Sequence, residues 1–285
     1  MSPGPAPQGA EGRVRTARLG LHVRRAGRGP VLLYLGGSSF DMRLRCAVMD
    51  SALPQHFDVV THEPRGLARS DAPPGEWTMR DYAEDAVGLM DALGIGRALV
   101  LGESFGGMTA LHLAALWPGR VRGLAVMAAT AGGRLGSSHP VQEWLALPPD
   151  AAARAALRVQ DLGFAALEAT DPAAAAARHA QRTAQERAFR ACPANAAGYP
   201  RLLAARAGHD AGPLLGRIAC PVIVMAGRED GQAPLAAVTR LAEALPEARL
   251  WTFPGGHGFG FATPEPVRRL IAAWTDQQPP QEVPT

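Results

Sequence analysis

Short apolar runs alternate with helix-like segments along most of this 285-residue chain, and this alternation constrains the fold more than any other feature. Residues 31–35, 98–101 and 121–127 are such runs, and residues 78–93 place apolar side chains at helical spacing after a threonine N-cap. Strands that alternate with helices are joined by βαβ crossovers, which produce a mostly parallel sheet with helices on both faces. We therefore expect an α/β fold.

Further segments extend this pattern. An alternating stretch around Gly20 predicts a β-hairpin over residues 13–25. The pattern predicts further strands at residues 57–61, 221–226 and 248–253, and further helices at residues 42–53, 108–117, 235–245 and 264–274. Together these segments predict an eight-stranded sheet.

The alternation is interrupted between residues 132 and 217, where the chain is rich in alanine and has few β-branched residues. This composition predicts a helical cap inserted between two strands of a core formed by residues 13–131 and 218–275. Residues 1–12 are rich in proline and glycine and have no apolar run typical of a signal peptide. We expect them, and the polar residues 276–285, to form disordered tails.

Composition excludes several classes of function. All 29 basic residues are arginine, which excludes lysine Schiff-base chemistry and the lysine-containing phosphate loop. The arginines are scattered and the formal charge is only +3, so we expect no nucleic-acid partner. No apolar run approaches the roughly 18 residues that span a bilayer, which predicts no membrane partner.

The cysteines and histidines lack the spacings of metal sites. Cys46, Cys192 and Cys220 form no C-x-x-C pair, which predicts free thiols and a cytoplasmic location. No H-x-x-x-H, H-x-E or G-x-G-x-x-G pattern occurs, so we expect neither a metal nor a dinucleotide cofactor.

The segment Gly102-Glu103-Ser104-Phe105-Gly106 directly follows an apolar strand, opens a helix and fits the pattern G-x-S-x-G. A nucleophile on such a sharp turn has strained backbone dihedrals, and the residues two positions before and after it must be small. The turn exposes the serine oxygen and directs the first helical amides at a developing oxyanion. Ser104 is therefore the predicted nucleophile; the alternative is a serine that only caps the helix.

A serine nucleophile needs a base, and His257 is the predicted one among the eight histidines. It lies in a glycine-rich loop after the last strand, at the carboxyl edge of the sheet, where the sites of α/β proteins form. Asp230, which follows the strand at residues 221–226, is the predicted acid that orients the imidazole. Its neighbour Glu229 remains the alternative acid.

Two backbone amides are needed to hold an oxyanion. We predict the amide of Phe105, which follows the nucleophile, and that of Gly37, which lies in a glycine-rich turn after an apolar strand. Ser38, His139 and Trp144 are candidates for the substrate pocket. For the two cap residues among them, a surface loop or ordinary packing is the alternative interpretation.

These motifs resemble the capped α/β-hydrolase superfamily, in particular its bacterial esterase and enol-lactonase branch. The similarity includes the chain order Ser104, Asp230, His257, and implies that these residues are nucleophile, acid and base. This sequence differs from the family pattern at Leu35-Gly36, where the family usually has His-Gly. The matching segments are VLLYLGGSS (31–39), THEPRGLARSDAP (61–73), GESFGGMTALHLAALWPGRV (102–121), PVIVMAGREDGQAP (221–234) and FPGGHGFGF (253–261).

The expected activity is that of a cofactor-independent serine hydrolase, which cleaves a small carboxylic ester or lactone through an acyl-enzyme. Two alternatives use the same residues differently. One is a thioesterase, acyltransferase or cyclase that acts on a biosynthetic intermediate. The other is a pseudo-enzyme that binds a ligand beneath the cap without turning it over. Neither the individual substrate nor the oligomeric state follows from the sequence.

Overall fold

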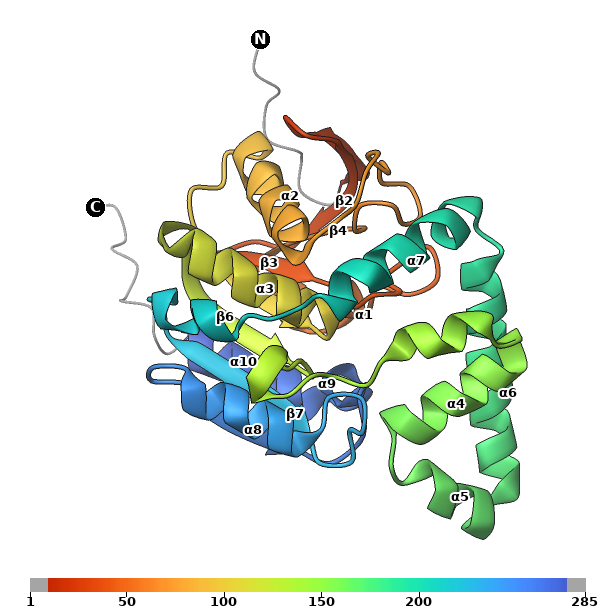
Figure 1. Ribbon diagram of the computed structural model, residues 1–285. Helices are drawn as coiled ribbons and strands as arrows, with labels where there is room; N and C mark the ends of the chain where they lie inside the picture. Colours follow the sequence, from red (N-terminus) through yellow and green to blue (C-terminus); the bar gives the residue numbers. More distant parts are fainter. Residues whose placement is uncertain (1–9, 276–285) are drawn as a thin grey trace.

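The computed structural model describes residues 10–275 and contains one eight-stranded sheet at its centre (Figure 1). The strand order is β1-β2-β4-β3-β5-β6-β7-β8. The pairs β1–β2 and β2–β4 are antiparallel, whereas all pairs from β4 to β8 in this order are parallel. The predicted eight-stranded, mostly parallel sheet is confirmed. The strands are β1 (Glu11–Arg15), β2 (Gly20–Ala26), β3 (Val31–Leu35), β4 (Asp58–His62), β5 (Ala98–Glu103), β6 (Val121–Met127), β7 (Val222–Gly227) and β8 (Arg249–Phe253).

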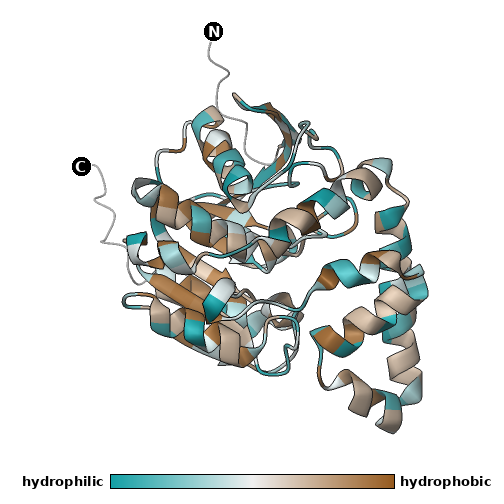
Figure 2. Cartoon of the chain, viewed as in Figure 1, coloured by the Kyte–Doolittle hydropathy of each residue, from teal (hydrophilic) through white to brown (hydrophobic). Residues whose placement is uncertain are grey.

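Helices cover both faces of the sheet, as the alternation predicts. Side chains of one strand therefore enter two hydrophobic cores: Leu33 and Leu35 of β3 pack on one face, and Leu32 and Tyr34 pack on the other. Burial on both faces explains why the central strands are continuous apolar runs, coloured as hydrophobic in Figure 2. The first core includes α2 (Met79–Ala92), α3 (Phe105–Leu116) and α8 (Leu235–Ala244); the second includes α1 (Ala47–Asp50), α9 (Phe259–Ala262) and α10 (Pro264–Thr275).

The segment between β6 and β7 is helical and corresponds to the predicted insertion at residues 132–217. Figure 1 shows α4, α5 and α6 beside the sheet as a separate group, with α7 returning toward the core. Leu157, Phe164 and Ala175 form a small core within this group. The elements of the segment are η3 (Gly133–Leu135), η4 (Val141–Ala146), α4 (Pro149–Gln160), α5 (Phe164–Thr170), α6 (Pro172–Arg190), α7 (Pro193–Ala207) and η5 (Gly212–Arg217).

The prediction of one helix over residues 42–53 is wrong. Only α1 and the short 3-10 helix η1 (Leu53–Gln55) form there. The Asp41 carboxylate accepts hydrogen bonds from both the backbone and the side chain of Arg43, which stabilises a turn where the helix was expected to begin.

The N-terminal end of the described chain also differs from expectation. Strand β1 begins at Glu11, inside the expected N-terminal tail, and pairs with β2. The remaining tail residues, 1–9 and 276–285, lie outside the described residues.

The predicted cap of α2 is present. The Thr78 side chain accepts a hydrogen bond from the Asp81 amide, and the Asp81 carboxylate accepts one from the Thr78 amide. This reciprocal capping box satisfies two amides that the helix itself leaves without partners.

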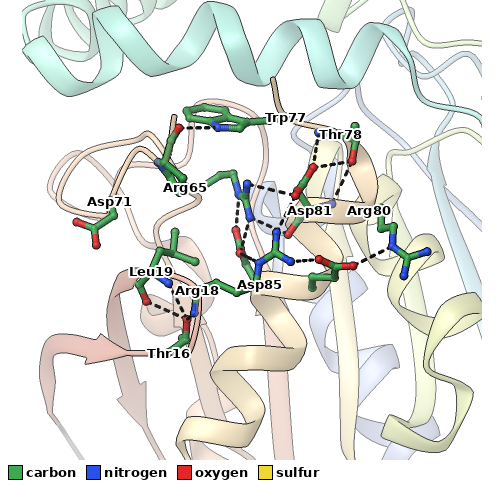
Figure 3. Close-up of polar contacts among 12 residues, drawn as sticks. Thr16, Arg18, Leu19, Arg65, Asp71, Trp77, Thr78, Arg80, Asp81 and Asp85 are labelled. Atoms are coloured by element: carbon green, nitrogen blue, oxygen red, sulfur yellow. Dashed lines mark hydrogen bonds and ion pairs between the residues drawn. The ribbon is translucent and has the colours of Figure 1, made fainter. Parts of the chain in front are cut away.

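The loop between β4 and α2 is held to α2 by a buried ion pair (Figure 3). Arg65, only 3% exposed, donates from Nε and Nη2 to the two carboxylate oxygens of Asp85, each at 2.6 Å. Arg18 lies 3.6 Å from the same carboxylate and also pairs with Asp81. Arg65 belongs to the THEPRGLARSDAP segment, and these contacts fix the loop to the helix.

Candidate active site

Ser104 lies at the turn between β5 and α3 with φ +54° and ψ −117°. These dihedrals are unfavourable for a residue that carries a side chain. A Cβ atom at Gly102 would collide with the carbonyl of Gly106, and one at Gly106 would collide with the carbonyl of Leu35. The glycines of G-x-S-x-G are therefore required by close backbone contacts around this turn.

The structure brings Ser104, His257 and Asp230 into one hydrogen-bonded row. The Ser104 Oγ atom lies 2.8 Å from His257 Nε2, and His257 Nδ1 lies 2.8 Å from Asp230 Oδ2. Ser104 is 7% exposed and Asp230 is 2% exposed. An ionised Asp230 holds the imidazole proton on Nδ1, which leaves the lone pair of Nε2 directed at the serine hydroxyl. This arrangement can remove a proton from Ser104.

Two adjacent strands position the acid and the base. Asp230 follows β7 and His257 follows β8, and these parallel strands are paired along their length. The second oxygen of Asp230 accepts hydrogen bonds from the amides of Gln232 and Ala233, both at 2.8 Å, which fixes the carboxylate. The alternative acid, Glu229, accepts a hydrogen bond from the Gly255 amide instead.

A pair of glutamines, absent from the sequence-based prediction, connects the insertion to this row. The Gln232 side chain is buried, and its Nε2 atom lies 2.7 Å from His257 Nε2 and 3.4 Å from Ser104 Oγ. Its Oε1 atom accepts a hydrogen bond from Gln160 at the end of α4. The two glutamines are 72 positions apart and belong to no local motif, so the sequence offers no signal that joins them.

A cavity of about 270 Å³ contains Ser104 and His257 in its wall. Of the residues predicted for the pocket, Ser38 and Trp144 line this cavity. His139 stands outside the lining and stacks on Trp144, with ring centroids 5.5 Å apart. The insertion contributes Val141, Trp144, Gln160, Arg182, Gln185, Glu186, Phe189 and Tyr199 to the wall.

The two residues predicted to hold an oxyanion lie beside the nucleophile. Gly37 lines the cavity, and a Cβ atom at this position would be 3.7 Å from Ser104 Cβ. Phe105 is the first residue of α3, so its amide has no acceptor within the helix. Its ring is buried and packs edge-on against Tyr82, with centroids 4.8 Å apart.

Glu103, the residue before the nucleophile, also lies in the cavity wall. Its carboxylate accepts a hydrogen bond from the Tyr34 hydroxyl. Burial, reinforced by the neighbouring Glu103, raises the pKa of Tyr34 well above its ordinary value. The phenol therefore stays protonated at neutral pH and remains a donor to Glu103.

Residues 10–275 contain no group of three histidine, cysteine or acidic side chains placed to hold a metal ion. Within the same range, every helix is too short or too polar to cross a membrane.

Comparisons with known proteins agree with the fold. The profile of the alpha/beta hydrolase fold family matches residues 30–263. The putative carbamate hydrolase RutD of Variovorax paradoxus (strain S110) is 33% identical over 203 residues, which are 70% of this chain and 74% of that protein. A protein of the same name from Caulobacter segnis is 32% identical over 251 residues, which are 84% of this chain and 88% of that protein.

Among solved structures, the enol-lactonase from Burkholderia xenovorans LB400 superimposes with a TM-score of 0.70 at 26% identity. The superposition covers 93% of this chain and 98% of the enol-lactonase. The resemblance to the capped esterase and enol-lactonase branch is thereby confirmed. This chain belongs to the alpha/beta hydrolase family and is a hydrolase.

Proposed function

We propose that this protein is a serine hydrolase that cleaves a carboxylic ester or a lactone through an acyl-enzyme intermediate. The observation that carries the proposal is the row of two 2.8 Å contacts from Ser104 to His257 and from His257 to Asp230. Nucleophilic catalysis by serine requires such a base within hydrogen-bonding distance and a third group that orients the base.

In the first half of the proposed reaction, His257 removes the proton of the Ser104 hydroxyl while the oxygen attacks the substrate carbonyl. The amides of Gly37 and Phe105 stabilise the negative charge that develops on the carbonyl oxygen. Asp230 stabilises the imidazolium. His257 then donates its proton to the leaving alkoxide, which departs as an alcohol and leaves the acyl group on Ser104. In a lactone, this alcohol stays attached to the acyl group.

In the second half, His257 removes a proton from a water molecule that attacks the acyl carbonyl. Collapse of this intermediate breaks the bond to Ser104, and the serine oxygen takes back a proton from His257. The product is a carboxylic acid, and the site returns to its initial state without a metal or an organic cofactor.

The helical insertion, residues 132–217, is proposed as a cap that selects the substrate. This proposal is supported by the eight cavity-lining residues that the insertion contributes, Trp144 among them. Ser38 faces them from the loop after β3. Because the cap supplies so much of the wall, differences in acyl-group preference are expected to follow cap residues.

Carbamate hydrolysis is a second candidate, favoured by the similarity to proteins named putative carbamate hydrolase. The same attack by Ser104 would then expel the alcohol of the carbamate and leave a carbamoyl group on Ser104, which water releases as a carbamic acid. A carbamate carbonyl is a weaker electrophile than an ester carbonyl, so turnover would require stronger stabilisation of the oxyanion.

The test compares the initial rates of wild type on a 4-nitrophenyl ester, a small lactone and a 4-nitrophenyl carbamate. We expect turnover of ester or lactone to exceed that of carbamate, and Ser104→Ala to lower kcat by at least roughly 10³-fold. Ser51→Ala is the matched control and should retain activity, because the Ser51 hydroxyl donates a hydrogen bond to the Val48 carbonyl and lies outside the cavity lining. Faster carbamate turnover would favour the second candidate; equal inactivity of wild type and Ser104→Ala on all three would contradict both.

A further inference from the structure

A second cavity, of about 130 Å³, is lined in part by the segment that joins β6 to η4. It shares none of its described lining residues with the cavity that contains Ser104. Its wall is formed by Met108, Gly132, Ser137, Ser138, Pro140, Gln142, Arg206, Ala207 and His209.

Arg206, near the end of α7, places a buried positive charge in this wall. The residue is 6% exposed, and its Nη2 atom donates to the His139 carbonyl at 2.9 Å. Its Nε atom is buried and lacks a hydrogen-bond partner among residues 10–275. Within that range no aspartate or glutamate forms an ion pair with its guanidinium. Burial lowers the pKa of Arg206, and a counter-charge would stabilise the guanidinium; no ion pair among the described residues supplies one.

The other groups in the wall add no charge. His209 uses both ring nitrogens: Nε2 lies 2.9 Å from the Thr130 carbonyl, and Nδ1 lies 3.3 Å from His112 Nε2. Burial lowers the pKa of His112 to about 4 and also lowers that of His209, so both rings are neutral at pH 7. Among the described lining residues, Arg206 is therefore the charged side chain; Asp210, next to His209, lies outside the lining but acts electrostatically on both histidines.

Neutral polar groups line the same wall. The Oε1 atom of Gln142 is buried without a partner among the described residues; a half-turn of the amide exchanges this acceptor for the NH₂ donor. Ser137 and Ser138 add hydroxyls, and that of Ser138 lies 3.1 Å from Thr130 Oγ1. One guanidinium with neighbouring hydroxyl donors suits an acceptor that carries one negative charge.

We propose that this cavity binds a small monovalent anion, a halide or a carboxylate of one or two carbons, with Arg206 as its counter-charge. The size agrees, because a cavity of about 130 Å³ has room for several water molecules and hence for a small anion. Chloride with residual water fits this space, and so does acetate. The site is independent of the reaction proposed for Ser104.

Bromide provides a direct test, because its anomalous scattering locates the ion. Crystals of the full chain grown without halide and soaked in sodium bromide should show an anomalous peak in this cavity, beside the Arg206 guanidinium. Addition of sodium acetate at the same ionic strength should reduce this peak, because the carboxylate takes the same place. Absence of a peak at Arg206 under saturating bromide would overturn the proposal.

Solution measurements give a second, independent readout. At constant pH and ionic strength, bromide should raise the Tm of wild type in a saturable manner, whereas gluconate, whose six-carbon chain exceeds the small anions proposed here, should not. Arg206→Met keeps an unbranched side chain without the charge and should abolish the bromide response. Arg187→Met, at an exposed position of α6, is the matched control and should preserve it. Equal responses of wild type and Arg206→Met would contradict the assignment.

Discussion

Asp230 accepts hydrogen bonds from His257 and from the amides of Gln232 and Ala233. Asp230 is the acceptor in all three hydrogen bonds and uses both carboxylate oxygens. A carboxylate can accept at both atoms, whereas the NH₂ group of an asparagine side chain cannot. The side chain next to it, Glu229, has a different partner at Gly255. At the residue scale, these neighbouring acids therefore have different roles: Asp230 is proposed to act in the reaction, whereas Glu229 holds the loop at Gly255.

Asp230→Asn should therefore lower kcat by roughly 10³- to 10⁴-fold, because the amide NH₂ favours the imidazole tautomer that cannot accept the serine proton. Glu229→Gln is the matched control, one residue away, and its kcat should remain within about tenfold of wild type. Steady-state kinetics on an activated ester, with circular dichroism to verify folding, measures both. A loss in Glu229→Gln as large as that in Asp230→Asn would contradict the choice of acid.

The sequence predicts much of the site at this scale, because Ser104, Asp230 and His257 each follow a recognisable strand. Gln232 and Gln160 could not be predicted in the same way. Glutamine has no preferred position in such motifs, and their contact depends on how α4 packs against the loop after β7. His139 lies outside the cavity lining and stacks on Trp144, which belongs to the lining; this placement likewise depends on packing within the insertion.

At the scale of elements, the buried pair of Arg65 and Asp85 joins the loop after β4 to α2 (Figure 3). Arg65→Met should destabilise the protein by about 3 kcal/mol, because the buried Asp85 carboxylate loses both hydrogen bonds from Arg65 and keeps, among the described residues, only Arg18 at 3.6 Å. The double variant Arg65→Met/Asp85→Leu should regain much of this loss. Urea unfolding of wild type, both single variants and the double variant measures the coupling. Additive losses would show that the pair does not stabilise this junction.

The elements show where local patterns suffice and where they fail. The strand at residues 31–35 and the helix capped by Thr78 are set by local apolar spacing and capping, and both form as predicted. Helix α3 begins at Phe105 and not at the predicted Met108, because the turn places Gly106 and Gly107 inside the helix despite their low helix propensity. The helix predicted from residue 42 fails because a turn at Asp41 replaces its first part.

At the scale of the whole molecule, the two cores bury ionisable groups that affect stability as pH changes. His62, at the end of β4, is buried, and neither ring nitrogen has a hydrogen-bond partner among the described residues. Desolvation lowers the pKa of His62 from 6.5 to about 4. Between these values the unfolded chain binds a proton that the folded protein excludes, so the free energy of unfolding falls as pH decreases from 6.5 toward 4.

His62→Leu should reduce this acid sensitivity. Between pH 7.5 and pH 4.5, the free energy of unfolding of wild type should fall by about 2–3 kcal/mol more than that of the variant. Urea unfolding at the two pH values measures this difference. His179→Leu, at a partly exposed histidine of α6, is the control and should behave as wild type. Equal losses in wild type and His62→Leu would show that His62 is not the source.

The reactivity of Ser104 toward a fluorophosphonate, which phosphonylates an activated serine and releases fluoride, tests the central claim most directly. The full chain is exposed to a fluorophosphonate, its intact mass is measured, and the modified peptide is sequenced by mass spectrometry. We predict a single adduct on Ser104 in wild type, none in Ser104→Ala, and much slower labelling in His257→Ala, which lacks the base. An unlabelled wild type, or an adduct that persists in Ser104→Ala, would contradict the account.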